Sequence, residues 1–334
     1  MSSSLRFGII GCGKIAPRHA AEAAKQGQLV AVCDIIPDKA NQLAAQYTAK
    51  AFYSIDELLK EEVDLLAICT PNGLHAEHSI KALEAGIHVL CEKPLSISSA
   101  DAKRMMEVAQ KNNRKLFVVK STRYNPSLVA LKKLIDEDRL GKLYSFQLNC
   151  FWNRPAPYYE NSWKGTKELD GGTLYTQFSH YIDAMLWLLG DVEDISGFRK
   201  NIAHQRIIDF EDSGVVSLQM KNGMLGGLNW SLNSFQKNME VSLSLITENG
   251  SIRIGGEYMN KIEYQLTDGF ELSIPTPGSA NDYGFYKGSM SNHDKVYENM
   301  LLALQNNNHP FTHATDGLKT VELIERIYNS VSLR

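Results

Sequence analysis

Short apolar runs alternate with helical segments in the first third of the chain. The apolar runs have strand length and cover residues 5–10, 29–33, 63–69, 88–91 and 115–119. Segments with helical periodicity lie between them, at residues 16–26, 38–47, 55–60, 76–85 and 101–111. Ser54 and Glu57 have the spacing of a capping box, which predicts the start of the third helix. Repeated strand–helix–strand units predict a parallel sheet with helices on both faces.

The pattern changes after about residue 121. It predicts a helix at residues 128–136, a long strand at 142–152 and a strong helix at 173–189. Strand-like runs follow between residues 192 and 272, separated by Asn222-Gly223, Asn249-Gly250 and Asp268-Gly269, which favour hairpin turns. Two helices, at residues 293–305 and 315–330, close the chain. We therefore predict an α/β domain of residues 1–122 and an α+β domain of residues 123–334 with a large, mostly antiparallel open sheet, the last helix being free to pack back on the first domain.

Composition narrows the class of protein. The 334 residues are 43% hydrophobic and 22% charged, which is typical of a folded chain rather than a disordered one. The net charge of −3 does not favour nucleic-acid binding. No apolar run approaches the ~20 residues of a membrane helix, and the first residues lack the pattern of an export signal. The five cysteines are odd in number and widely spaced, so we expect neither disulfides nor a bound metal, and a cytoplasmic protein without a membrane partner.

A glycine-rich turn follows the first strand and opens the first helix. Residues 11–16 read Gly-Cys-Gly-Lys-Ile-Ala, which has the form G-x-G-x-x-A. In this context the glycines permit a tight turn and the close approach of a pyrophosphate, which the helix N-terminus binds. Asp34 ends the second strand, where a carboxylate binds ribose hydroxyls, and Ile35-Ile36 offers no cation for a 2′-phosphate. The first domain is therefore predicted to be a doubly wound Rossmann domain that binds NAD; a glycine-rich turn without a ligand is the alternative.

Polar residues follow two more strands of the predicted parallel sheet. Residues 70–75 follow the third strong strand and Glu92-Lys93-Pro94 follows the next, at the edge where ligands lie in open parallel sheets. Asn72 has the alternative role of capping the next helix, and a Glu-Lys-Pro triplet alone is usually a turn. On the helix at residues 173–189, Thr176 and His180 are four residues apart and share one face. A histidine is a natural general base for an alcohol, although a lone helical histidine is more often structural.

Together these motifs resemble the glucose–fructose oxidoreductase / inositol dehydrogenase / MocA family over essentially the whole chain. The resemblance rests on residues 11–16, Asp34, residues 70–75, Glu92-Lys93-Pro94, Arg123-Tyr124-Asn125-Pro126 and Gly171-Gly172…His180…Asp183. It implies that Lys93 and His180 are catalytic and flank the substrate carbon opposite the nicotinamide. Many members have an aspartate where this chain has Thr176, so the Asp–His pair of those members is absent here. The cofactor-binding residues predicted from the motif and the resemblance are Gly11, Gly13, Lys14, Ile15, Asp34, Thr70, Asn72, His75, Glu92, Lys93 and Gln177.

The loop after the long strand of the second domain carries a further likeness. Residues 152–159 and 162–166 read W-N-R-P-A-P-Y-Y and S-W-K-G-T, similar to the substrate loop of the UDP-N-acetyl-glucosaminuronate 3-dehydrogenases of surface-polysaccharide and lipopolysaccharide biosynthesis. Residues 286–289 with 292–293 also resemble that branch. Independently, aromatic rings beside Arg154 and Lys164 suit a stacked sugar and a bound carboxylate or pyrophosphate; a subunit contact is the alternative. The predicted substrate-binding residues are Arg123, Arg154, Tyr159, Trp163, Lys164, Thr176, Asn292 and His293.

The predicted reaction is NAD-dependent oxidation of a secondary sugar hydroxyl, at C3 of UDP-N-acetyl-glucosaminuronate. His180 accepts the hydroxyl proton in this hypothesis, and Lys93 stabilises the charge on the same oxygen. The alternatives are another sugar or inositol dehydrogenase of the family, an NAD-dependent glycosidase, and a non-catalytic NAD-binding sensor or repressor. The predicted partners are a nucleotide-sugar substrate and further copies of the chain, as a dimer or tetramer, because a sheet with one uncovered face favours association.

Overall fold

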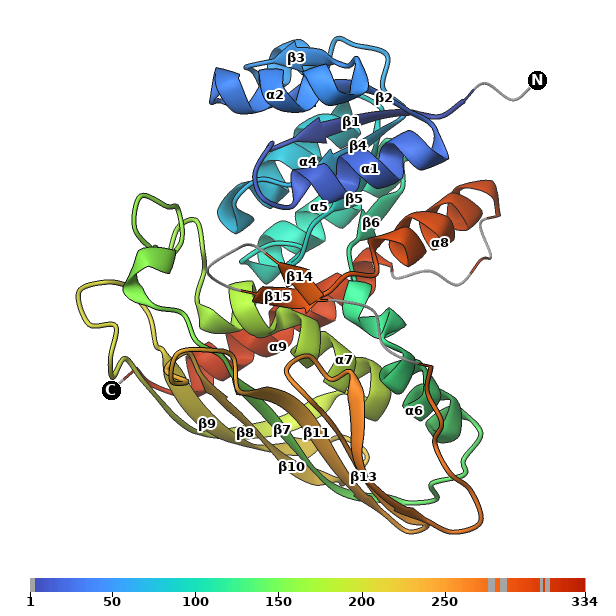
Figure 1. Cartoon of the computed structure of the whole chain (residues 1–334), viewed down its shortest axis with the longest axis vertical. Coiled ribbons are helices and arrows are strands. Elements are labelled where there is room, and N and C mark those ends of the chain that lie inside the picture. Colours follow the sequence, from blue (N-terminus) through green and yellow to red (C-terminus); the bar gives the residue numbers. More distant parts are fainter. Residues whose placement is uncertain (1–3, 276–279, 283–286, 307–308, 310–312, 334) are drawn as a thin grey trace. The chain divides into compact units, whose positions relative to one another are not determined.

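The computed structural model describes residues 4–275, 280–282, 287–306, 309 and 313–333 (Figure 1). The chain forms two compact units, one of Met1–Lys120 with His293–Val321 and the other of Ser121–Asn292 with Glu322–Arg334. The first unit therefore includes α8 (His293–Gln305) and part of α9 (Ala314–Ser330) from the end of the chain. Among the described residues, every helix is too short or too polar to cross a membrane.

The first unit is built on a six-stranded parallel sheet. Its order is β3-β2-β1-β4-β5-β6, and every neighbouring pair is parallel. The strands are β1 (Arg6–Ile10), β2 (Gln28–Cys33), β3 (Lys50–Phe52), β4 (Leu65–Ile68), β5 (His88–Cys91) and β6 (Leu116–Val118). The helices are α1 (Ala16–Gln26), α2 (Pro37–Tyr47), α3 (Ile55–Leu58), α4 (His75–Glu84) and α5 (Ser99–Lys111). Strand order reverses between β1 and β4, which places helices on both faces and confirms the predicted Rossmann domain.

Three local features of the first unit differ from the sequence analysis. β3 was not predicted, because its three residues, which include Lys50, are too few to show a strand pattern. Ser54 precedes α3 but its side chain makes no capping hydrogen bond, so the predicted capping box is not formed. Asn72 does not cap α4 either, because it begins a 3₁₀ turn, Asn72–Leu74, and Leu74 precedes the helix.

The second unit is built on a seven-stranded sheet, order β13-β12-β11-β7-β10-β9-β8. Its strands are β7 (Leu143–Phe151), β8 (Val192–Lys200), β9 (Ser213–Met220), β10 (Leu225–Ser231), β11 (Glu240–Thr247), β12 (Gly250–Gly255) and β13 (Lys261–Thr267). Only β7 and β10 pair in parallel among these strands, which confirms a mostly antiparallel sheet. The unit also contains α6 (Pro126–Asp136) and the short pair β14 (Ala280–Asp282) and β15 (Lys287–Met290).

Two of the three predicted hairpin turns join paired strands. Asn222-Gly223 joins β9 to β10, and Asn249-Gly250 joins β11 to β12. The third predicted hairpin is not formed within the described residues, because residues 270–275, which follow Asp268-Gly269, form no strand. The backbone of Leu272 hydrogen-bonds to the side chain of Gln265 rather than to the backbone of a strand. The Gln265 side chain accepts from the Leu272 N–H (2.8 Å) and donates to the Leu272 carbonyl (3.1 Å).

The helix predicted at residues 173–189 begins with a π-helical segment. Residues Leu174–Phe178 form this segment, and α7 (Ser179–Leu189) continues it. The backbone N–H of Leu174 donates to the hydroxyl of Tyr328 (2.9 Å), a partner from outside the helix. Tyr328 lies against Gly172 (φ +138°), where an added Cβ would come within 2.5 Å of its hydroxyl. The first turn of this helix, which carries Thr176, is therefore irregular at the point where the backbone N–H of Leu174 hydrogen-bonds to Tyr328 instead of within the helix.

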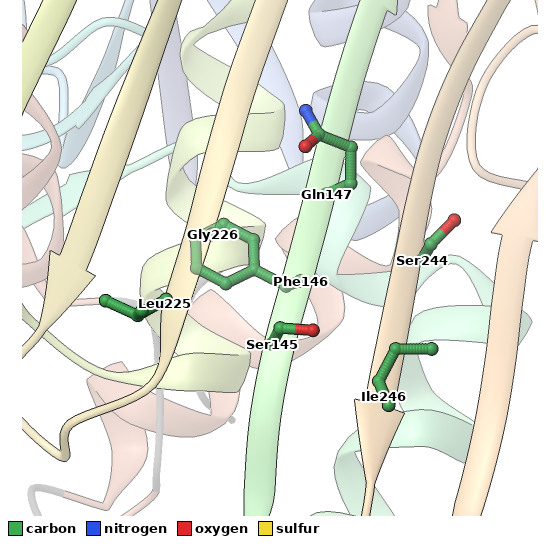
Figure 2. Close-up of a pocket in the computed structure, with 7 residues that line it drawn as sticks. All are labelled: Ser145, Phe146, Gln147, Leu225, Gly226, Ser244 and Ile246. Atoms are coloured by element: carbon green, nitrogen blue, oxygen red, sulfur yellow. The ribbon is translucent and has the colours of Figure 1, made fainter.

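The two faces of the second sheet differ in burial. Along β7, Phe146, Leu148 and Cys150 are buried, whereas the alternate residues on the other face are only half-buried. An open hollow of about 380 Å³ lies on this sheet where β11, β7 and β10 are neighbours. Figure 2 shows the seven residues that line it. Its lining is Ser145, Phe146, Gln147, Leu225, Gly226, Ser244 and Ile246, so it includes no predicted site residue.

Candidate active site

The turn between β1 and α1 has the geometry of a pyrophosphate cradle. Gly11 has φ +89°, and an added Cβ would lie 2.6 Å from the Cys69 carbonyl oxygen, so a side chain does not fit there. Gly13 has no neighbouring atom within 4 Å of an added Cβ, which leaves open space beside the turn. Lys14 is exposed and Ile15 is half-buried, directly before α1. This observation fits a phosphate that approaches the backbone at Gly13 and the start of α1.

Asp34 connects this turn to the end of β2. One carboxylate oxygen accepts from the Cys12 backbone N–H and the other from the Ile36 backbone N–H, each at 2.8 Å. A carboxylate oxygen has two lone pairs, so Asp34 keeps acceptor capacity for ribose hydroxyls. Ile35 beside it is 87% exposed. Asp34 therefore offers acceptor capacity at the end of β2, and its role in binding the adenosine ribose stays a prediction.

Thr70 and His75 form the next part of this edge. His75 is buried, with Nδ1 2.7 Å from the Pro94 carbonyl oxygen and Nε2 2.9 Å from the Thr70 carbonyl oxygen. Burial lowers the pKa of His75. Asn72 is also buried, in the 3₁₀ turn between them. His75 therefore links the segment after β4 to the segment after β5.

Glu92 lies at the centre of a buried cluster after β5. One carboxylate oxygen is 3.0 Å from Nε2 of His19 and 3.2 Å from Nε2 of His293, and the other accepts from the Lys93 backbone N–H (3.0 Å). Burial raises the pKa of Glu92, but the hydrogen bonds from both histidines outweigh it and hold the pKa well below its usual range. Lys93 is half-buried and precedes a cis Pro94. His293, predicted for substrate, and Glu92, predicted for cofactor, are direct partners; their binding roles stay predictions.

His180 lies near the start of α7 in the second unit. It is 6% exposed, and its Nε2 is 3.5 Å from the hydroxyl of Ser289 on β15. Thr176, four residues earlier, donates its hydroxyl to the carboxylate of Asp170. Asp170 is 1% exposed and also accepts from the Gly165 backbone N–H (2.8 Å); burial raises its pKa to about 6. Sequence reasoning did not identify Asp170 as a site residue, whereas Ser289 belongs to residues 286–289, which carried the likeness to the UDP-sugar branch.

Arg154 organises the aromatic loop of the second unit. It is 2% exposed, donates from Nε to the Gln177 side-chain oxygen (2.8 Å), and its guanidinium lies 4.7 Å from the ring centre of Trp152. The Gln177 amide donates to the Tyr158 hydroxyl (2.8 Å). Lys164 places its ammonium 4.7 Å from the ring centre of Tyr158. The structure therefore brings Arg154, Lys164 and Gln177 together around Tyr158, a residue that was not in the predicted set.

The other loop residues lie close to this group. Tyr159 is buried, with its ring edge-on to Tyr158 at 4.9 Å between ring centres, and burial raises its pKa. The ring centre of Trp163 is 5.2 Å from the Lys164 ammonium. The Lys164 ammonium thus lies near two aromatic rings, those of Tyr158 and Trp163. The cation–π attraction between them is stronger where water is excluded.

Two predicted substrate residues have structural partners within the second unit. Arg123 forms a bidentate ion pair with Asp183, at 2.7 and 2.8 Å. The Asn292 amide donates to the Ser121 carbonyl (3.0 Å) and to the Asn125 side-chain oxygen (2.8 Å). Their roles in substrate binding stay predictions, and Tyr286, which also carried the likeness, lies outside the described residues.

Comparison with known proteins places the chain in a family. Residues 5–120 match an oxidoreductase family with an NAD-binding Rossmann fold, and residues 128–253 match the GFO/IDH/MocA C-terminal domain. The WlbA dehydrogenase from Bordetella pertussis, crystallised with NADH and UDP-GlcNAcA, is 32% identical, with a TM-score of 0.87 over 98% of this chain and 96% of that chain. The glucose-6-phosphate 3-dehydrogenase of Bacillus subtilis is 27% identical over 98% of this chain and 96% of its own length. An uncharacterized oxidoreductase of Streptococcus pneumoniae is 29% identical over 68% of this chain, which spans only 62% of that relative. The chain belongs to the GFO/IDH/MocA family of NAD-binding oxidoreductases.

Proposed function

We propose that the chain is an NAD-dependent dehydrogenase that oxidises C3 of UDP-N-acetyl-glucosaminuronate. The observation that carries this proposal is the aromatic loop, in which Arg154 and Lys164 lie over the ring of Tyr158 at 5.2 and 4.7 Å from its centre. Aromatic faces suit a sugar ring, and two cations suit a carboxylate and a pyrophosphate on the same ligand. The similar WlbA structure contains UDP-GlcNAcA, a ligand of that description.

The chain's own residues would hold the cofactor and move one proton. NAD would be held by Gly11, Gly13 and Asp34, and when bound it supplies the acceptor for a hydride. His180 accepts the hydroxyl proton as general base, and the Lys93 ammonium stabilises negative charge on the same oxygen.

Asp170 supplies the carboxylate that Thr176 cannot. Members of the family with an aspartate at the position of Thr176 have a carboxylate on the helix of the histidine itself. Here the Thr176 hydroxyl donates to Asp170, so a buried carboxylate is joined to that helix position through a hydroxyl. A pKa of about 6 lets Asp170 take or release a proton near neutral pH. We propose that this pair sets the proton balance around His180.

The proposal is tested by NADH absorbance with a panel of UDP-uronates, UDP-hexoses and inositols. We expect turnover with the UDP-uronates. Lys164→Met should raise KM for a UDP-uronate about tenfold (~1.4 kcal/mol) or more and leave KM for an uncharged inositol unchanged. Lys167→Met is the matched control, because Lys167 is exposed in the same loop. Equal KM values for wild type and Lys164→Met would refute the role of this loop.

The remaining alternatives give different outcomes in the same assay. Release of free sugar without net NADH would favour a glycosidase. NADH binding without turnover of any sugar would favour a sensor. Turnover of inositols alone would assign the chain to a different substrate within the same family.

We also propose that a second copy of the chain covers the open face of the second sheet. Six apolar residues on that face are 45–67% exposed: Phe198, Val215, Leu225, Ile246, Tyr264 and Leu266. They share the face of the hollow in Figure 2. Burial of such a surface stabilises association. Size-exclusion chromatography with light scattering should give a dimer or tetramer, and a monomer would reject this proposal.

The cytoplasmic location of the protein also stays a prediction.

A further inference from the structure

Three buried histidines contact the residues on either side of Lys93. His19 on α1 and His293 on α8 contact the carboxylate of Glu92, and His75 on α4 contacts the carbonyl of Pro94. All three rings are at most 5% exposed. Each ring belongs to a different helix of the first unit, so three helices fix one short turn.

The hydrogen-bond partners assign the ring protons of His19 and His293. Nδ1 of His19 lies 3.0 Å from the hydroxyl of Tyr297, which can donate to it and leaves the ring proton on Nε2. Nδ1 of His293 has no hydrogen-bond partner among the residues that the structure describes, so its ring proton also belongs on Nε2, the atom that faces Glu92. The Glu92 carboxylate then accepts two imidazole N–H groups and the Lys93 backbone N–H.

This network constrains Lys93 from both sides. The Lys93 backbone N–H is bound to a carboxylate that two helices hold in place, and the next residue is held by His75, which also contacts the Thr70 carbonyl. A catalytic ammonium must be held within about 0.5 Å of its productive position. Its own four-carbon stem is flexible, so the backbone has to supply that precision.

We propose that His19, His75 and His293 are positioning residues that hold the Glu92–Pro94 turn, and with it Lys93, in its productive place. This inference rests on the proposed catalytic role of Lys93. The ligand types of His19, Glu92 and His293 would also suit a divalent cation, since the three ligand atoms lie within 4.8 Å of one another. The three N–H donors already satisfy the carboxylate, so we assign a hydrogen-bonded clamp rather than a metal site.

The test compares His19→Leu and His293→Leu with His19→Gln and His293→Gln. Leucine removes the N–H donor, whereas the glutamine amide can place an N–H near the position of Nε2. We expect the leucine variants to lose on the order of 10²-fold in kcat, because small displacements of a catalytic group have effects of that size. KM for NAD should not change, and the glutamine variants should recover most of the rate. His88→Gln is the matched control, since His88 lies at the opposite end of β5 and contacts the Lys115 backbone instead.

Hydrogen exchange separates this inference from the proposed reaction. In protein without substrate, the backbone of residues 91–95 should exchange faster in the leucine variants, with peptides of the second unit unchanged. Faster exchange throughout the first unit, or an unchanged segment 91–95, would overturn the clamp. One zinc ion per chain in purified wild type, lost in His293→Gln, would overturn it in favour of a metal site. If wild type oxidises no sugar, the proposed function fails, while the exchange result still decides whether the clamp exists.

Discussion

Glu92 in the first unit and Asp170 in the second are both withdrawn from solvent, at 7% and 1% exposure, yet their pKa values move in opposite directions. Burial raises both. For Glu92, hydrogen bonds from His19 and His293 outweigh burial and hold the pKa well below its usual range. For Asp170, the hydrogen bonds from Thr176 and Gly165 do not, and the pKa rises to about 6. The donors around a buried carboxylate therefore decide its charge more than its depth does.

This difference suggests different uses for the two carboxylates. Glu92 is a fixed anion over the whole neutral range, which suits a group that holds a turn in place. Burial raises the pKa of Asp170 to about 6, which suits the proton exchange that we propose for the Thr176–Asp170 pair. Lys93 adjoins the first carboxylate, and His180 follows Thr176, the partner of the second, by four residues.

The largest expected effect is on turnover. His180→Ala and Lys93→Ala should each lower kcat by ~10²–10⁴, because a general base or a charge-stabilising group contributes about that much. NADH binding, followed by fluorescence, should stay close to wild type in both. Wild-type turnover in either variant would reject the proposed catalytic role of the residue that was replaced.

The next effect is a change in how stability depends on pH. The pKa of Asp170 is raised on folding, so its contribution to stability is full below the unfolded pKa of about 3.9 and is lost as pH rises through about 6. Asp170→Asn removes this loss, because the amide does not titrate. The decrease in unfolding free energy between pH 4 and pH 7 should be smaller in the variant by up to about 3 kcal/mol.

Urea unfolding at several pH values measures this effect. Asp209→Asn is a suitable control, because Asp209 is an exposed aspartate in the same unit. Identical pH profiles for wild type and Asp170→Asn would show that Asp170 is ionised as readily as an exposed aspartate.

Glu92→Gln should act in the opposite direction. The pKa of Glu92 is lowered on folding, so its contribution is present above the unfolded pKa of about 4.3 and is lost on acidification. Glu92 accepts from the imidazole N–H groups of His19 and His293 and from the Lys93 backbone N–H. A glutamine side chain has only one acceptor oxygen, so at least one of these three N–H groups would face the glutamine NH₂ group, which is itself a donor. We expect a loss of about 1–3 kcal/mol at pH 7 and a smaller loss at pH 4, measured by the same urea titration. If Glu92→Gln were more stable than wild type at pH 7, the pKa of Glu92 would not be lowered on folding, and the two pKa shifts would not be opposite in direction.

The sequence predicted these regions to different depths. Strand runs, the glycine turn and Glu92-Lys93-Pro94 were recognisable, because local periodicity and turn chemistry determine them. His19 could have been found as well: it follows Ala16 by three residues and shares the buried stripe of Ala20 and Ala23, where a histidine needs a polar partner. The sequence did not show that this partner is Glu92.

Long-range pairs account for what was missed. Glu92 and His293 are 201 residues apart, and no local pattern connects them. The π-helical segment at Leu174–Phe178 likewise accompanies a contact with Tyr328, 154 residues from Leu174. The helix itself was predicted from its periodicity. Its irregular first turn, which holds Thr176 against Asp170, depends on tertiary packing that periodicity does not contain.

The smallest expected effect concerns a third buried carboxylate, Glu211. Burial raises the pKa of Glu211 to about 7, although the Tyr328 hydroxyl donates a hydrogen bond to its carboxylate (2.9 Å), which lowers the pKa. The pKa of Glu211 is therefore raised to a higher value than that of Asp170. Tyr328→Phe removes that donor and also the acceptor for the Leu174 N–H, and should lower stability by about 1 kcal/mol. The loss should be larger at pH 8 than at pH 5, because a hydroxyl binds a carboxylate more strongly than a carboxylic acid. Urea titrations at the two pH values measure this loss of stability. An equal loss at both pH values would show that the Tyr328 hydroxyl stabilises the fold only through the Leu174 N–H and does not affect the ionisation of Glu211.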